Sequence, residues 1–337
     1  MSMKKQVRKD KPNESLIRDV YMENFRDEIK IITKLIETYK YVSFDTEFPG
    51  VIFQCQQNTR EAYYKSIKQN VDKLKLIQMG ITIADEHGNT PQGVNTWQFN
   101  LKFDLNNDQY SNESIALLCN SGIDFEKLQS NGIPAEIFGE YMMTSGLLLN
   151  EELHWISFHG IYDFAYFMKV VTNLPLPETE FLFFDCLKLY FPHYYDIRHL
   201  VRFNDCFRGS LAKLGVELNV SRVGTMHQAG SDSLITSEIF FKLKKEYLSE
   251  DACKTDRNIL FGIGLGLDEE TTYYNSFKVN NTFSYDYPNY YPQNMMNMQY
   301  NYIRNNPNYF PVNNYNYQYM NQMNMPYNID EKKDRKS

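Results

Sequence analysis

Two acidic residues with one residue between them, Asp45 and Glu47, follow the apolar run at residues 41–44 and precede Pro49-Gly50. Alternate side chains of a strand point to the same face, so a strand here would place the two carboxylates side by side. Such neighbours repel each other unless a cation lies between them, and acidic residues are depleted in strand interiors. Oxygen ligands on a rigid element suit Mg²⁺ or Mn²⁺. On these residues alone, a divalent-metal site and a polar strand end are equally good interpretations.

Two later segments add acidic residues beside predicted helix starts. Asp163 follows a predicted strand at residues 155–159 and opens a helix, which would bring its carboxylate to the sheet edge where ligand sites of α/β proteins gather. Asp232 lies near the start of a helix predicted over residues 229–248. Each residue could instead serve only as a helix cap.

A histidine lies close to the last of these acids. His227 precedes Asp232 by five residues, which is about 140° around a regular helix. The two side chains can therefore share a site only if His227 lies in the loop before the helix. Gly224 and Gly230 favour such an irregular approach.

Periodicity along the chain predicts an α/β domain. Apolar residues at three- and four-residue steps predict one amphipathic helix over residues 15–40, and the polar stretch 52–70 indicates an irregular surface loop. Other strands are predicted at residues 74–84, 96–103, 155–159 and 194–197. Other helices are predicted at residues 112–119, 124–129, 134–149, 164–171, 178–190, 210–214 and 229–248. This order indicates a mixed sheet flanked by helices.

Composition excludes several classes of protein. With 337 residues and 42% hydrophobic content, the chain can bury a substantial core. No apolar run approaches the roughly 18 residues of a membrane helix. Five scattered cysteines without a Cys-x-x-Cys pair argue against a disulfide framework or structural zinc, and for a cytoplasmic or nuclear setting. The formal charge of -7 argues against non-specific binding to duplex DNA, but a local basic groove can coexist with it.

Composition also divides the chain into three parts. Residues 1–14 are polar and charged and are predicted to be a flexible leader. Residues 15–268 carry the periodic pattern of one folded domain. Residues 269–337 are rich in Asn, Tyr and Met without an aliphatic face, and we expect this tail to be disordered.

The order of the acidic residues resembles a known superfamily. The chain resembles the histidine-bearing branch of the DEDD exonucleases in the order of three motifs. These are Asp-x-Glu on a first strand, then Tyr-Asp, then His-x-Ala-x-x-Asp before a helix. Longer segments resemble the Caf/Pop-type deadenylases of the Ccr-Not complex: VSFDTEFPGV at residues 42–51, NVD at 70–72, TWQFN at 96–100, MTSG at 143–146, WISFH at 155–159, RVG at 222–224 and HQAGSDSL at 227–234. The likeness spans residues 17–267 and does not include the tail.

The resemblance implies a ribonuclease H-like fold and a 3′-to-5′ exoribonuclease that shortens mRNA poly(A) tails and releases 5′-AMP. It also implies docking to the Ccr-Not scaffold subunit and to a nuclease subunit with leucine-rich repeats. In chemical terms, two divalent ions, Mg²⁺ or Mn²⁺, can clamp a scissile phosphate. Their expected ligands are Asp45, Glu47, Asp163 and Asp232, and His227 is suited to orient or deprotonate the attacking water.

Other residues near the motifs have weaker signals. Phe48 and Tyr162 could stack on a terminal base or pack in the core, and His159 could line the site or be a structural residue at a strand end. Asp196 follows Tyr194-Tyr195 and imitates a catalytic Tyr-Asp, but the four acidic places are already filled, so we interpret it as a cap.

The chain departs from the family pattern at one place in these motifs. It has Gly160-Ile161 where family members usually show Ser-Gly. The segment keeps its length, so Asp163 should still be placed correctly, although local substrate contacts can differ. Two alternatives to a poly(A)-specific enzyme stay open: a related 3′-exonuclease without preference for adenine, and a catalytically silent scaffold module.

Overall fold

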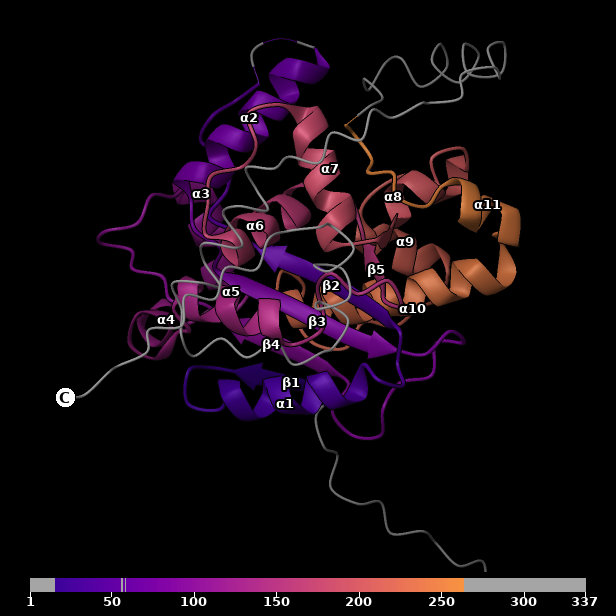
Figure 1. The fold of residues 1–337 in the computed structure, drawn as a ribbon, viewed down its shortest axis with the longest axis horizontal. Coiled ribbons are helices and arrows are strands. Elements are labelled where there is room, and N and C mark those ends of the chain that lie inside the picture. Colours follow the sequence, from indigo (N-terminus) through magenta and orange to yellow (C-terminus); the bar gives the residue numbers. More distant parts are fainter. Residues whose placement is uncertain (1–15, 56, 58, 264–337) are drawn as a thin grey trace, which may run out of the picture. The chain divides into compact units, whose positions relative to one another are not determined.

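A computed structural model describes residues 16–55, 57 and 59–263 of the chain. Its centre is a six-stranded sheet in the order β1-β4-β3-β2-β5-β6 (Figure 1). The strands are β1 (Ile17–Val20), β2 (Tyr41–Glu47), β3 (Gln78–Ala84), β4 (Thr96–Asn100), β5 (His154–Ser157) and β6 (His193–Asp196). Strand β3 runs antiparallel to both of its neighbours, whereas the other pairings are parallel. The predicted mixed sheet flanked by helices is confirmed.

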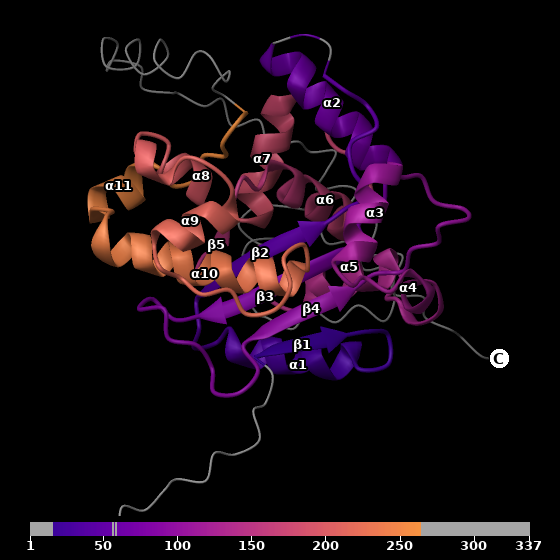
Figure 2. The same cartoon turned by 180° about the vertical axis from the view of Figure 1, so that it is seen from behind.

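One face of the sheet is covered by the long helix α10 (Ala229–Glu246), which contacts β2, β3, β4 and β5 (Figure 2). The helix can approach closely because β3 has a glycine below its first turn. A Cβ atom on Gly80 would lie 1.9 Å from the carbonyl oxygen of Ala229. Gly80 pairs with Asp45 in β2, so this close packing brings the start of α10 next to the first acidic residue.

The other face of β2 carries an aromatic core. Phe44 lies 4.7 Å from Phe164 of α6 (Ile161–Thr172) and 5.3 Å from Trp155 of β5, measured between ring centroids. Phe44 and Asp45 are consecutive in a strand and therefore point to opposite faces. The same alternation that buries Phe44 under α6 turns Asp45 toward α10.

The remaining helices surround this framework. They are α1 (Phe25–Leu35), α2 (Arg60–Lys73), α3 (Asn112–Asn120), α4 (Phe125–Asn131), α5 (Ala135–Thr144), α7 (Glu180–Tyr190), α8 (Ile197–Leu200), the 3-10 helix η1 (Asp205–Phe207), α9 (Leu211–Glu217) and α11 (Glu250–Thr255). The sequence pattern did not predict α8, η1 or α11. No helix within the described ranges is long and apolar enough to cross a membrane.

The prediction of a single helix over residues 15–40 is wrong. Residues 17–20 form β1, which pairs in parallel with β4, and only Phe25–Leu35 is helical. The side-chain amide oxygen of Asn24 accepts a hydrogen bond from the backbone N–H of Tyr21 and closes a turn between strand and helix. Spacing of apolar residues could not reveal a strand whose partner lies far along the chain.

The predicted irregular loop at residues 52–70 is also corrected, because α2 occupies much of it. Thr59 caps this helix by accepting a hydrogen bond from the N–H of Ala62. Tyr64, Ile67 and Val71 are buried at steps of three and four residues, which is the spacing of one helix face. The segment appeared irregular because its other positions are polar.

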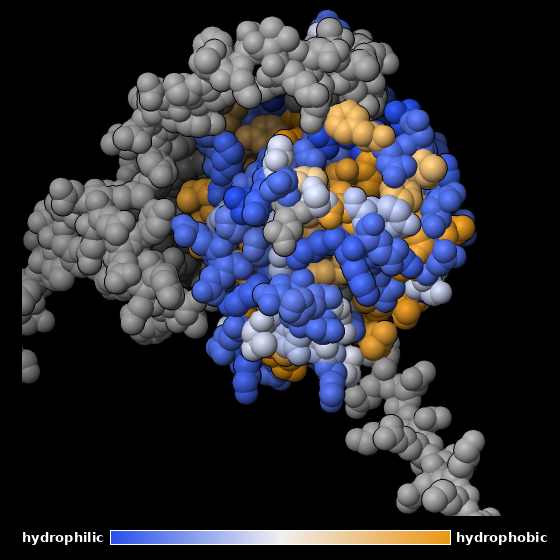
Figure 3. Space-filling model, turned by 90° about the vertical axis from the view of Figure 1, so that its right-hand side faces the viewer, coloured by the Kyte–Doolittle hydropathy of each residue, from blue (hydrophilic) through white to orange (hydrophobic). Residues whose placement is uncertain are grey.

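The face that carries α8, α9 and α11 mixes hydrophobic and hydrophilic side chains (Figure 3). Three large apolar side chains of this region are more than half exposed: Phe203 at 58%, Val216 at 75% and Tyr247 at 53%. The predicted leader at residues 1–14 and tail at residues 269–337 lie outside the described residues.

Candidate active site

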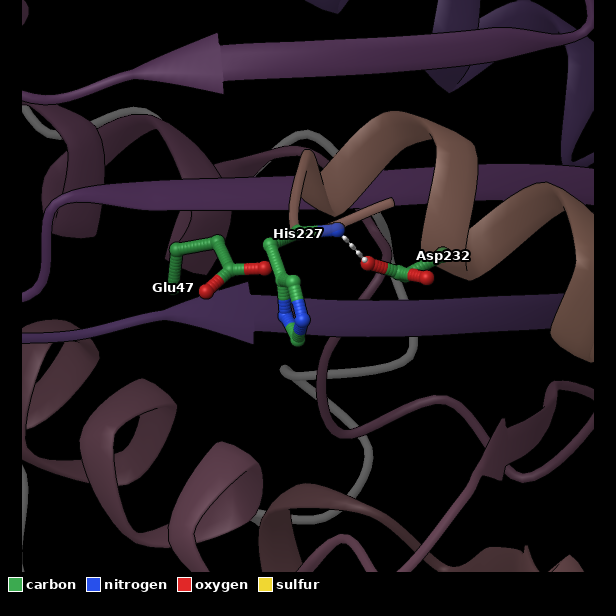
Figure 4. Close-up of side chains that lie close together, drawn as sticks. All are labelled: Glu47, His227 and Asp232. Atoms are coloured by element: carbon green, nitrogen blue, oxygen red, sulfur yellow. Dashed lines mark hydrogen bonds between the residues drawn. The ribbon is translucent and has the colours of Figure 1, made fainter. Parts of the chain in front are cut away.

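The structure brings together three predicted site residues, from β2, from the start of α10 and from the loop before it. One ligand atom from each of Glu47, His227 and Asp232 lies within 4.8 Å of the others (Figure 4). Glu47 ends β2, and Asp45 precedes it by two positions on the same face. Their carboxylates thus face the start of α10, which carries Asp232. This grouping joins parts of the chain about 180 residues apart and depends on the packing of α10 on the sheet.

Asp45 and Asp163 lie outside this set of ligand atoms, but Asp163 is hydrogen-bonded to β2 next to it. It lies in the first turn of α6, whose N-cap is Gly160, so it is not the cap of its own helix. Its Oδ1 accepts hydrogen bonds from the backbone N–H and the hydroxyl of Thr46, at 2.8 and 2.5 Å. Thr46 stands between Asp45 and Glu47 in β2, and the charge of Asp163 raises the pKa of both of these acids. The residue type at position 46 was not singled out from sequence, because a threonine in a strand is ordinary.

His227 lies in the loop before α10, which satisfies the condition for sharing a site with Asp232. Its backbone has a positive φ of 61°, and its N–H donates to Asp232 Oδ2 at 2.9 Å. The side chain of Asp232 therefore reaches back to the loop from the first turn of the helix. Figure 4 shows the imidazole of His227 beside the carboxylate of Glu47.

Two buried glutamines hold the start of α10 on the sheet. Gln78 of β3 accepts the N–H of Ala229 at 2.8 Å, and Gln98 of β4 accepts the N–H of Gly230 at 2.9 Å. These bonds satisfy backbone donors that have no partner within the helix. Sequence reasoning missed both glutamines; polar residues at buried strand positions were the available signal.

Burial and mutual repulsion disfavour the charged forms of these acids. Burial, followed by the charges of Asp163, Asp232 and Glu47, holds the pKa of Asp45 well above its usual range. Burial and the neighbouring aspartates raise the pKa of Glu47 to about 8. Burial raises the pKa of Asp163 to about 7, against the hydrogen bonds from Thr46. A divalent cation would offset this repulsion, and the carboxylates are the hard oxygen donors that Mg²⁺ and Mn²⁺ accept.

A basic residue that sequence reasoning did not assign to the site also lies here. Arg222 Nη1 donates to Asp232 Oδ1 and, at 3.1 Å, to the hydroxyl of Ser231. Its positive charge lowers the pKa of Asp45 and of Glu47, in opposition to burial. The only indication of this role in the sequence was an arginine five residues before His227.

The predicted stacking residues contact each other. The rings of Phe48 and Tyr162 are stacked with their centroids 5.2 Å apart. Phe48 also stacks on Tyr166, with a centroid distance of 4.9 Å. Phe48 and Tyr162 are half-buried, whereas Tyr166 is fully buried. An interaction with a base through the partly exposed rings stays a prediction.

Asp196 is a structural cap, as predicted. Its buried carboxylate accepts the N–H groups of Arg198, His159, Gly160 and Phe261 at 2.8 to 3.2 Å. His159, which has a positive φ of 59°, packs edge-on against Phe261, and burial lowers its pKa. The contacts of His159 are therefore structural, and a role in RNA binding stays a prediction. None of the five cysteines, all within the described residues, forms a disulfide.

Comparison with known proteins identifies the family. Residues 20–135 match the model of the CAF1 family ribonucleases. The chain is 43% identical over 253 residues to the poly(A) ribonuclease pop2 of Schizosaccharomyces pombe, and the match covers 74% of this chain and 76% of that relative. The chain belongs to the CAF1 ribonuclease family. The segments that suggested a Caf/Pop-type nuclease therefore indicated the correct family.

Solved structures of CAF1 ribonucleases share the fold. The structure of S. pombe Pop2p in its Mg²⁺- and Mn²⁺-bound form is similar with a TM-score of 0.70 at 43% identity, covering 74% of this chain and all of that one. A yeast CAF1 co-crystallized with the NOT1 MIF4G domain is similar with a TM-score of 0.64 at 29% identity, covering 75% of this chain and 99% of that one. The ribonuclease H-like fold expected for this chain is confirmed.

Proposed function

We propose that this chain is a poly(A)-specific 3′-to-5′ exoribonuclease that shortens mRNA tails and releases 5′-AMP within the Ccr-Not complex. The observation that carries the proposal is the cluster of Glu47, His227 and Asp232, with Asp163 of α6 hydrogen-bonded to Thr46 of β2, in a chain with 43% identity to a poly(A) ribonuclease. A silent scaffold would gain nothing from buried carboxylates that repel each other. The chain acts as a phosphodiester hydrolase.

Asp45, Glu47, Asp163 and Asp232 would hold two divalent cations, Mg²⁺ or Mn²⁺. The fit rests on the donor set, because burial raises the pKa of Asp45, Glu47 and Asp163, and the charges of neighbouring acids add to the rise at Asp45 and Glu47. The metal-bound form of the related Pop2p supports the assignment. When bound, such ions supply an activated water and stabilise the departing oxygen.

The protein's own residues orient the reaction. Thr46 fixes Asp163 through two hydrogen bonds, and the backbone of His227 fixes Asp232. These bonds preorganise the acids before RNA binds. The imidazole of His227 lies beside Glu47 and is suited to orient the attacking water or to accept its proton. Phe48, Tyr162 and His159 are the proposed contacts to the terminal nucleotide.

The partners follow from the family. The complex of a yeast CAF1 with the NOT1 MIF4G domain supports docking of this chain to the corresponding scaffold subunit. Binding to a leucine-rich-repeat nuclease subunit is a further proposal that rests on the family resemblance. We also propose that the protein acts in the cytoplasm and in the nucleus, where its five thiols would stay reduced.

The proposal is tested with the full chain, Mn²⁺ or Mg²⁺, and 5′-labelled RNAs that share a body but end in A, U or C tails. We expect the A tail to shorten from its 3′ end until non-A sequence is reached, with 5′-AMP as the product. Equal degradation of every tail would instead support an exonuclease without preference for adenine. Absence of hydrolysis in both metals would support a silent scaffold.

A further inference from the structure

Arg222 is held at the acidic group by the loop between α9 and α10. The hydroxyl of Ser231 donates to the carbonyl of Val223 at 2.7 Å, and Gly224 has a φ of +88° that turns the chain there. The Arg222 side chain is 17% exposed and that of Asp232 is 8% exposed. This guanidinium is therefore largely removed from water, where an ion pair is screened less than on the surface.

The contacts of Arg222 engage the same carboxylate that is proposed to bind metal. Arg222 donates to Oδ1 of Asp232, while the backbone N–H of His227 donates to Oδ2. Both oxygens of Asp232 thus have donors in the structure. A cation that approaches Asp232 must share or displace the contact with Arg222.

Charge gives this contact a wider effect. If all were ionised, the acidic group would carry four negative charges, at Asp45, Glu47, Asp163 and Asp232. The positive charge of Arg222 partly compensates those at Asp45 and Glu47 as well as that of its direct partner, Asp232. A buried charge without a partner is costly. A fixed positive charge offsets part of this cost whether or not a metal ion is bound.

We propose that Arg222 is the internal counter-ion of the acidic group: it holds Asp232 and stabilises the metal-free protein, and it competes with divalent cations for the same carboxylate. Arg222 is a positioning residue that sets the affinity for the ions. This inference rests on the proposed function, because it takes the four acids as metal ligands. Its consequence is that loss of the arginine has opposite effects on the two states, weakening the metal-free fold and strengthening metal binding.

The test compares wild type, Arg222→Gln and Arg222→Lys as full chains stripped of metal with a chelator. Arg26→Gln is the matched control, since Arg26 is exposed on α1, beside Tyr141. Mn²⁺ binding is measured by isothermal titration calorimetry at pH 7.5, and thermal unfolding is followed with and without Mn²⁺.

We expect Arg222→Gln to bind Mn²⁺ about tenfold more tightly, or about 1.4 kcal/mol, because one opposing charge is lost. Its melting temperature without metal should fall by several degrees, and saturating Mn²⁺ should remove most of this difference. Arg222→Lys, which keeps the charge, should bind within about threefold of wild type. The control should match wild type in both measurements.

Unchanged or weaker Mn²⁺ binding by Arg222→Gln would overturn the counter-ion assignment while leaving the proposed nuclease intact. A variant with unaltered stability in the metal-free state would also contradict it. If wild type itself binds no Mn²⁺, the proposed metal site fails and the inference fails with it. The two failures are therefore distinguishable from the wild-type titration alone.

Discussion

Asp45→Asn is expected to lower kcat for hydrolysis of a poly(A) RNA by about 10³-fold or more, because loss of one metal ligand removes several kcal/mol of transition-state stabilisation. The substitution keeps the size of the side chain, so α10 should still pack on Gly80, the partner of Asp45 in β3. Steady-state kinetics with saturating RNA measure kcat, and circular dichroism verifies the fold. Activity within tenfold of wild type would show that Asp45 is not a metal ligand.

The matched control for this substitution is Asp27→Asn. Asp27 is an exposed aspartate of α1 that pairs with Lys30 at 2.9 Å. Exposed pairs of this kind contribute little to stability, so Asp27→Asn should retain wild-type kcat. A comparable loss of activity in the control would point to a general effect of charge on RNA binding.

Asp45→Asn should also alter how the free energy of unfolding depends on pH in the absence of metal. The pKa is raised to about 8 for Glu47 and to about 7 for Asp163, and it is raised well above its usual range for Asp45. The folded state therefore binds more protons than the unfolded state above about pH 4, and wild-type stability falls as pH rises from 4 toward 8. The Asp45→Asn variant has one acid fewer, so its free energy of unfolding should fall less over this pH range. Urea unfolding with a chelator at pH 5 and pH 8 measures the difference.

Asp196→Ala is expected to lower the free energy of unfolding by about 3 to 5 kcal/mol, the largest effect on stability that we predict. Its carboxylate accepts four backbone N–H groups, from Arg198, His159, Gly160 and Phe261. The alanine variant leaves these donors without their acceptor. Urea unfolding followed by tryptophan fluorescence measures the loss, since Trp155 lies on the strand adjacent to β6.

Asp196→Asn serves as the graded variant, because an amide oxygen accepts some of the same bonds, and its loss should be about half. A loss below 1 kcal/mol for Asp196→Ala would contradict the capping role. Mn²⁺ binding by Asp196→Asn should equal that of wild type. A defect in metal binding without a defect in stability would make Asp196 a ligand instead of a cap.

Local sequence patterns predicted much of the candidate site. The Asp45–Glu47 pair depends on the two-residue repeat of one strand, and the position of His227 depends on where a long periodic helix begins. Asp163 was expected at a helix start and lies in the first turn of α6. Each of these expectations could be made from one continuous stretch of the sequence.

The errors and omissions depend on contacts between distant parts of the chain. The strand β1 exists because Ile17 pairs with Thr96, and no local repeat of a few apolar residues separates such a strand from the start of a helix. Gln98 reaches the N–H of Gly230 only after α10 has packed on the sheet. Arg222 likewise acquires its role from the acids gathered around it, which lie on separate elements.

The most direct test of the central claim is to locate Mn²⁺ by anomalous diffraction in crystals of the full chain. Two anomalous peaks bounded by Asp45, Glu47, Asp163 and Asp232 are the expected result, and both should disappear after treatment with a chelator. Manganese bound elsewhere, with these carboxylates left without a cation at saturating concentration, would contradict the assignment of this group as the metal site of the nuclease.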